Sequence, residues 1–314
     1  MNIFSSNQMN DKLQKELNNN QYCLFNDDCI EAMKKLEDNS VDSVVTDPPY
    51  IGMINEKWDR IDKQNADILF SELFKQVYRI LRYGGRFICF CSENTLSYLY
   101  RHNNLLHREL LVVEKDVKKV SAGRNTSNYK QHINCTEYVF VCTKYARENT
   151  RKMLLDRKGD YTSKQINEIL GVKSNGGGMW SIYTGKNKCN QVPTKEIWEK
   201  FKKVFNDLPN YETFEEVFNN TLSKGNILKN ISFNFPNRKH PTQKPLILME
   251  YLIETYTREN DNIVDPFMGS GTTGVACGNL NRKFIGIELE KDYYETAKKR
   301  IHNTYSYNKL EDND

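Results

Sequence analysis

The segment IVDPFMGSGTTGVA, residues 263–276, constrains the fold of this chain more than any other. It begins with an apolar run, turns through Gly269, Gly271 and Gly274 in the spacing G-x-G-x-x-G, and continues with residues that suit a helix. Glycines let the backbone approach a ligand closely, and the N-terminus of the following helix presents free N–H groups to it. The segment therefore predicts a strand, a tight turn and a helix of an open α/β sheet, with a ligand at the turn.

A second strand-like run, residues 284–287, ends at Glu288, which lies 19 residues after Gly269. In dinucleotide-binding folds an acid about this far along the chain accepts hydrogen bonds from ribose hydroxyls. We therefore predict that the C-terminal part binds a cofactor that contains a nucleoside. The alternative is a glycine-rich turn that only packs a helix against the sheet.

The residues around the glycines favour one of two cofactors. The glycine spacing alone would suit NAD. Asp265, however, stands beside the turn, where a carboxylate repels a pyrophosphate and attracts an ammonium group. Thr272 and Thr273 add hydroxyl and N–H groups that suit a carboxylate. An amino-acid head joined to a ribose describes S-adenosylmethionine, which we favour over NAD.

The tetrapeptide D-P-P-Y follows another apolar run, residues 40–46, which is typical of a buried strand. Ligands of open α/β sheets bind at such strand ends. Pro48 and Pro49 lack N–H donors, which leaves carbonyls free to accept from a ligand. Asp47 adds a charged acceptor, and Tyr50 adds a flat face for stacking. Together these groups suit a planar ring with an exocyclic amino group, such as adenine or cytosine. A proline-rich turn without further function is the alternative.

The composition sets broader limits. The chain has 314 residues, 38% of them hydrophobic, which is enough for a substantial core with an insertion or a second domain. Its net charge of +4 permits nucleic-acid binding without demonstrating it. The eight cysteines include no C-x-x-C pair and predict reduced, buried thiols of a cytoplasmic protein. We expect no metal site, and the polar N-terminus and absence of long apolar runs predict no leader and no membrane span.

The order of these motifs resembles the β class of amino-group DNA methyltransferases, which make N6-methyladenine or N4-methylcytosine. In that class a D-P-P-Y or S-P-P-Y block comes first, a target-recognition region follows, and an F-x-G-x-G block, here starting at Phe267, comes last. Four further segments match the class in order: N-D-D-C-I at 26–30, G-G-R-F-I at 84–88, N-C-T-E-Y-V-F-V at 134–141 and H-P-T-Q-K-P at 240–245.

The resemblance, together with the alternation of strand-like and helix-like runs, implies an α/β chain with a Rossmann-like S-adenosylmethionine-dependent methyltransferase fold. We expect a mostly parallel sheet, a circularly permuted motif order and an inserted, mainly helical domain. The expected parts are an N-terminal arm at 1–20, a catalytic half at 21–145, an inserted target-recognition domain at 146–235, an S-adenosylmethionine-binding half at 236–305 and a polar tail at 306–314.

The resemblance also implies roles for individual residues. Asp47 and the Pro48 carbonyl would accept from the target amine, while Tyr50 would stack on the base; Pro49 completes this catalytic tetrapeptide. The cofactor-binding set comprises Asp28 on the adenine, Asp265 on the amino group, Thr272 and Thr273 on the carboxylate, Glu288 on the ribose, Phe267, Gly269 and Gly271 at the turn, and Thr242 and Lys244 near the carboxylate.

Two regions are candidates for DNA contact. In the insertion, Thr162 is an N-cap candidate for a helix that stops near Gly171, which resembles the start of a helix-turn-helix. The alternative is a helical insertion that only supports the fold. A basic loop between strands of the catalytic half offers phosphate contacts, with a solvated loop as the alternative. Its candidate residues are Lys118, Lys119, Arg124 and Lys130.

The predicted function is methyl transfer to N6 of adenine in double-stranded DNA. Adenine is favoured because many N4-cytosine enzymes of the class carry serine where this chain has Asp47. A homodimer and a cognate restriction endonuclease are the further partners that the resemblance suggests, in the cytoplasm of a bacterium or a phage-infected bacterium. Three alternatives are N4-cytosine methylation, an RNA or protein methyltransferase, for which the motif order is usually reversed, and a DNA-binding relative without activity.

Overall fold

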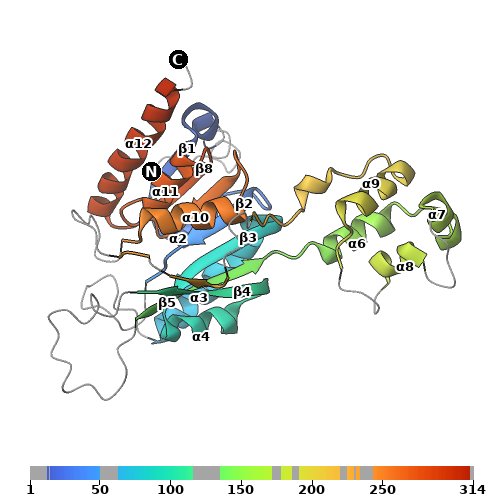
Figure 1. Ribbon diagram of the computed structural model, residues 1–314, viewed down its shortest axis with the longest axis horizontal. Coiled ribbons are helices and arrows are strands. Elements are labelled where there is room, and N and C mark those ends of the chain that lie inside the picture. Colours follow the sequence, from blue (N-terminus) through green and yellow to red (C-terminus); the bar gives the residue numbers. More distant parts are fainter. Residues whose placement is uncertain are drawn as a thin grey trace.

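An eight-stranded sheet forms the centre of the molecule, with strand order β1-β8-β7-β2-β3-β5-β4-β6 (Figure 1). The computed structural model describes residues 13, 15–49, 63–115, 135–171, 178–185, 191–219, 225–229, 231–233 and 243–311. Only β5 runs antiparallel to its neighbours, β3 and β4. The strands are β1 (Tyr22–Asn26), β2 (Val41–Thr46), β3 (Leu81–Cys91), β4 (Leu106–Glu114), β5 (Thr136–Thr143), β6 (Ile227–Leu228), β7 (Asn262–Asp265) and β8 (Lys283–Glu288).

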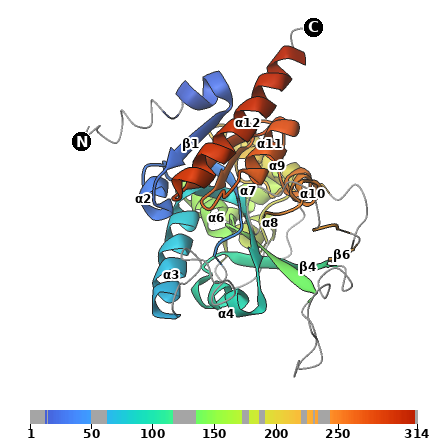
Figure 2. The same cartoon turned by 90° about the vertical axis from the view of Figure 1, so that its left-hand side faces the viewer.

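Helices cover both faces of this sheet (Figures 1 and 2). Consecutive residues of a strand point to opposite faces, so Val44 and Phe87 pack in one core and Val45 and Ile88 in the other. Strands buried on both sides in this way are typical of parallel α/β sheets. The helices on the first face are α2 (Cys29–Met33), α3 (Lys63–Ile80) and α4 (Glu93–His102), and those on the second are α10 (Leu246–Tyr256), α11 (Thr272–Asn279) and α12 (Lys291–Glu311).

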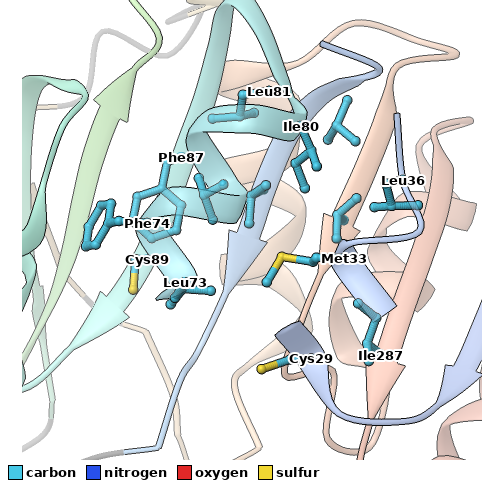
Figure 3. Packing of buried hydrophobic residues seen from close by; sticks show 14 of the residues in the cluster. Cys29, Met33, Leu36, Leu73, Phe74, Ile80, Leu81, Phe87, Cys89 and Ile287 are labelled. Carbon is cyan, nitrogen blue, oxygen red and sulfur yellow. The ribbon is translucent and has the colours of Figure 1, made fainter. Parts of the chain in front are cut away.

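The packing of α3 in the first core explains the helical spacing of its apolar residues (Figure 3). Phe70, Leu73, Phe74 and Val77 recur at the spacing of one helix face and are 0–1% exposed. The ring of Phe74 meets Phe87 of β3 edge to face, with centroids 5.1 Å apart. This packing fixes α3 against the strand that follows it.

The junction between β7 and β2 is the point that positions the ligand site. These two strands are parallel neighbours, with Ser43 opposite Ile263 and Val44 opposite Val264. From this junction the sheet extends through β8 and β1 on one side and through β3 on the other. Ligands of open α/β sheets bind beyond the carboxyl ends of the strands at such a switch point. Asp47 and Asp265 therefore come together although more than two hundred residues separate them.

A second body of helices follows β5 and has a core of its own, built around Trp198, Phe201 and Phe214. It extends away from the sheet (Figure 1). Within the range expected for the inserted domain, β6 pairs with β4 and extends the sheet, so this part of the range lies outside the helical body. The body contains α6 (Arg147–Asp156), α7 (Ser163–Ile169), α8 (Gly178–Thr184), α9 (Lys195–Val204) and the 3₁₀ turn η2 (Tyr211–Thr213).

The local signals predicted for α7 are present. Thr162 caps the helix, and its reciprocal bonds with Gln165 form a capping box. Gly171 follows with a φ of +70°, which a glycine adopts without strain. Asn167 of α7 accepts a hydrogen bond from the Trp180 backbone N–H at 2.9 Å and so ties α7 to α8. These two helices therefore pack as a pair.

The predicted fold class is confirmed: the molecule is an α/β protein with a mostly parallel sheet and a helical insertion. Of the predicted N-terminal arm, residues 15–20 are helical. Among the described residues, no helix is both long and apolar enough to cross a membrane.

Candidate active site

The turn between β7 and α11 forms one wall of the site, and its geometry explains two of the glycines. Gly271 has a φ of +81°, a left-handed conformation that other residues adopt only with strain. Gly274 faces α12 and β8 so closely that a Cβ atom would lie 2.6 Å from Ile301 and 2.7 Å from Phe284. One glycine therefore shapes the turn, and the other lets α11 pack closely against the sheet.

Asp265 lies at the carboxyl end of β7 and is only 3% exposed. Its two carboxylate oxygens accept hydrogen bonds from Thr46 at 2.8 Å and from Thr273 at 2.6 Å, and the Phe267 N–H donates at 3.1 Å. Burial raises the pKa of Asp265 to about 7, although these hydrogen bonds act in the opposite direction. The site thus holds a carboxylate that would gain from a cationic ligand.

Two further acids, Glu288 and Asp28, line the same space. Glu288, at the end of β8, accepts from the Gly269 N–H at 2.9 Å and from the Glu290 N–H at 2.8 Å. Burial raises its pKa. Asp28 caps α2 by accepting from the backbone N–H of Ile30 and Glu31 at 2.9 and 3.1 Å. The three acids predicted to hold the cofactor therefore all occupy fixed positions around one space.

That space is a cavity of about 280 Å³ that also reaches Asp47, Pro48 and Pro49 of the tetrapeptide predicted to be catalytic. Asp47, directly after β2, lies next to the β7 turn because Thr46 bonds to Asp265 across the strand junction. The sequence separation of these two partners is 219 residues. The lining brings together the predicted residues Asp28, Asp47, Pro48, Pro49, Lys244, Asp265, Phe267, Gly269, Thr272, Thr273 and Glu288.

The two threonines predicted to hold the cofactor carboxylate have contacts within the protein that this prediction did not include. The Thr273 hydroxyl donates to Asp265, so its described partner is an acid of the protein. Arg300 of α12 donates to the Ser270 carbonyl and hydroxyl and reaches the Thr272 hydroxyl at 3.5 Å. A cation therefore stands next to the threonine predicted to meet the cofactor carboxylate.

Lys244 also has partners that the sequence did not suggest. Its ammonium lies 2.6 Å from an Asp47 carboxylate oxygen and 3.5 Å from Glu137 of β5. Lys115, just after β4, contacts the other oxygen of Glu137 at 2.5 Å. Glu137 lies in the segment 134–141, which resembles a strand of the family. Nothing in the spacing of this segment predicts a contact with Lys244.

Several predicted residues lie outside the described part of the chain. These are Tyr50 of the tetrapeptide, Thr242, and the loop residues Lys118, Lys119, Arg124 and Lys130. Their roles stay predictions.

Comparison with known proteins identifies the family to which this site belongs. Residues 41–299 match the N6/N4 family described as DNA methylase. This chain is a member of that family. The DNA methylase is 45% identical to the putative methylase YubD of Escherichia coli K12 over 278 residues, covering 87% of each chain. It is 27% identical to the type II methyltransferase M.HpaI of Haemophilus parainfluenzae, covering 88% of this chain and 73% of that one.

The fold is shared with a solved methyltransferase. The structure of the M1.HpyAVI–SAM complex matches with a TM-score of 0.51 and 24% identity, covering 89% of this chain and 99% of that one. S-adenosylmethionine is the methyl donor of the DNA methylase, as predicted. The chemistry of the cavity fits it: buried Asp265 suits an ammonium, and Glu288 lies at the strand end where acids accept from ribose hydroxyls.

Replacement of Glu288 by alanine is expected to weaken S-adenosylmethionine binding by about tenfold or more. The change removes a charged acceptor for the ribose hydroxyls, and loss of a hydrogen bond to a charged group costs about 1.5–3 kcal/mol. It also leaves the Gly269 N–H without its partner. Isothermal titration calorimetry measures the effect, with Glu250→Ala on the surface of α10 as the control. Unchanged affinity in Glu288→Ala would remove this residue from the cofactor site.

Proposed function

We propose that this DNA methylase transfers a methyl group to the exocyclic N6 of adenine in double-stranded DNA. The observation that carries the proposal is the position of Asp47, at the carboxyl end of β2 and beside the Asp265 turn in one cavity. Aspartate in the first position of the tetrapeptide favours adenine over cytosine. The matched family is named for both N6 and N4 methylation, so membership does not favour either base.

The target base must leave the duplex to reach this cavity, because its amine lies inside the base stack. Extrusion costs a few kcal/mol. Asp47 and the Pro48 carbonyl would accept from the amine, and Tyr50 would stack on the flipped ring. Holding the amine in line with the methyl donor supplies orientation, which contributes up to about 7–11 kcal/mol in favourable cases.

The transfer is a direct displacement. When bound, S-adenosylmethionine supplies an electrophilic methyl group on a sulfonium, whose sulfur keeps the electron pair of the broken bond. The lone pair of the amine nitrogen forms the new N–C bond, and the nitrogen gains a positive charge until one of its protons leaves to water. Asp47 stabilises that positive charge. Because the amine attacks the methyl group directly, the reaction needs no covalent intermediate with the protein.

Around the cofactor, Asp265 would hold the amino group, Glu288 the ribose and Asp28 the adenine. Thr272, next to Arg300, would meet the carboxylate. Phe267 and the glycine turn shape the cavity wall.

The helical body is proposed to recognise the target sequence. Its core residue Trp198 is 0% exposed, donates from its indole to the Pro209 carbonyl at 2.8 Å, and meets Phe214 edge to face. We expect Trp198→Ala to destabilise this body by about 3–5 kcal/mol. DNA binding, measured by mobility shift, would fall strongly, while calorimetric S-adenosylmethionine affinity would stay within about threefold. Wild-type DNA binding by a variant with a melted helical body would contradict a role in recognition.

Nucleoside mass spectrometry tests the proposed function. Plasmid DNA and bulk RNA are each incubated with the protein and isotopically labelled S-adenosylmethionine, then digested. Label in N6-methyladenine from DNA alone supports the proposal. Label in N4-methylcytosine would keep the fold and the displacement but overturn the choice of base, and label in RNA alone would overturn the substrate.

A further inference from the structure

Four charged side chains from distant parts of the chain lie close together where the carboxyl ends of β2 and β4 meet the start of β5. Asp47 follows β2, Glu137 begins β5, Lys115 follows β4 and Lys244 precedes α10. The strand register explains the meeting: Thr46 pairs with Cys89 of β3, whose end pairs with the start of β5. The ends of β2, β3 and β4 therefore meet the start of the antiparallel strand.

The charges alternate along this row. Lys244 lies 2.6 Å from Asp47 and 3.5 Å from Glu137, and Lys115 lies 2.5 Å from Glu137. The Lys244 side chain is 6% exposed and those of Asp47 and Glu137 are 19% and 10% exposed. A buried charge is costly unless it is paired, so an alternating row of this kind is stable only as a unit.

We propose that Lys244 is a positioning residue that keeps Asp47 ionised and aimed into the cavity. Glu137 pairs with Lys244, and Lys115 pairs with Glu137. The inference rests on the proposed methyl transfer, and it assigns Lys244 a role that the cofactor-contact prediction did not contain. The amine nitrogen becomes positive as the new N–C bond forms. An ionised acceptor stabilises that charge, whereas a protonated carboxyl does not.

The groups that face Asp47 explain why it needs a cation. Lys244 is its ammonium partner, while the carboxylates of Glu137 and Asp265 both oppose its ionisation. Cys89 and Cys91 of β3 also face it; burial raises the pKa of both thiols, to about 12 for Cys91, so they stay neutral. Burial alone would lower the pKa of Lys244, but Asp47 and Glu137 raise it, and the ammonium stays charged.

Replacement of Lys244 by methionine is therefore expected to raise the pKa of Asp47 and to give kcat a new acid limb. At saturating S-adenosylmethionine, methyl transfer would fall about tenfold per pH unit below the new pKa, because only ionised Asp47 supports it. Cofactor affinity would stay within about threefold. Relative to the wild type, the variant protein without cofactor would also lose stability as pH rises toward the new pKa of Asp47, because a folded-state acid with a raised pKa binds protons more tightly than the unfolded chain.

Two variants complete the test. Lys244→Arg keeps the positive charge and is expected to show no acid limb, even if its rate is lower. Lys144→Met is the matched control: Lys144 is also buried and holds backbone carbonyls, but it follows the far end of β5. It is expected to lower stability without a new limb in kcat between pH 5 and pH 8. If Lys244→Met does not fold, Lys244→Gln serves in its place.

The outcomes separate this inference from the proposed function. An acid limb in Lys244→Met that is absent in Lys244→Arg supports the positioning role. A wild-type pH profile in Lys244→Met, or a loss of cofactor affinity equal to the loss of rate, would overturn it and leave Lys244 as a cofactor contact. The assay counts transferred methyl groups on any base, so it does not depend on the choice of base, and a wild-type protein without transfer would speak against methyl transfer itself.

Discussion

The Asp47→Asn variant is expected to lose methyl transfer by about 10²–10³-fold while S-adenosylmethionine affinity changes less than about threefold. Removal of one fixed group that stabilises transition-state charge typically costs this much. Asparagine is the better replacement because it keeps the shape beside Lys244, which lies 2.6 Å away. Alanine would leave the buried ammonium without this partner and cost about 3–5 kcal/mol of stability.

The chain offers a matched control in β2, the strand that Asp47 follows. Asp42, near the start of β2, is paired with Arg82 and has a side chain 20% exposed, against 19% for Asp47. Asp42→Asn should lower stability without changing kcat. Single-turnover transfer to plasmid DNA and calorimetry measure the two quantities. Equal losses of transfer in both variants, or loss of cofactor binding in Asp47→Asn, would contradict the role given to Asp47.

The affinity for S-adenosylmethionine is expected to rise steeply with pH up to about pH 7. Burial raises the pKa of Asp265 to about 7 in the protein without cofactor, and only the ionised carboxylate attracts the amino group of the cofactor. Below pH 7 the dissociation constant should rise about tenfold per unit, to about 100-fold at pH 5. The amino group itself stays protonated over this range, because α-amino groups titrate near pH 7.7–8.0.

The same shift affects stability without cofactor. Because the folded-state pKa of Asp265 is raised above its ordinary value of 3.8, the folded chain binds the proton more tightly. The contribution of this group to stability is therefore largest at acid pH and is lost as pH rises toward about 7. Asp265→Asn should bind the cofactor at least about tenfold more weakly and with little pH dependence between pH 5 and pH 7. A steep dependence that persists in this variant would assign it to another group, such as Glu288.

Much of the fold could be predicted because its signals are local. The run before Asp265, the glycines and the following helix form one continuous segment, and the structure shows the strand, turn and helix there. Glu288 was expected at the end of a strand and ends β8. Each of these signals depends on neighbouring residues, so the sequence contains all of the information that decides them.

The unpredicted parts depend on contacts between distant segments. The bond between Lys244 and Asp47 spans 197 residues. Glu137 reaches Lys244 because β5 runs antiparallel beside β3, which brings the start of β5 to the carboxyl end of β3. No spacing in the sequence indicates that orientation. The two-residue strand β6 is too short for a periodic signal, and it joins the sheet through its parallel pairing with β4.

A crystal structure of the protein with S-adenosylhomocysteine tests the central claim most directly, since that claim places the cofactor and Asp47 in one cavity. We predict that the ligand fills the space between Asp265 and Asp47, with its amino nitrogen within about 3.2 Å of an Asp265 carboxylate oxygen. Its sulfur would face the tetrapeptide. A ligand bound outside this cavity, or with its amino group away from Asp265, would contradict the account.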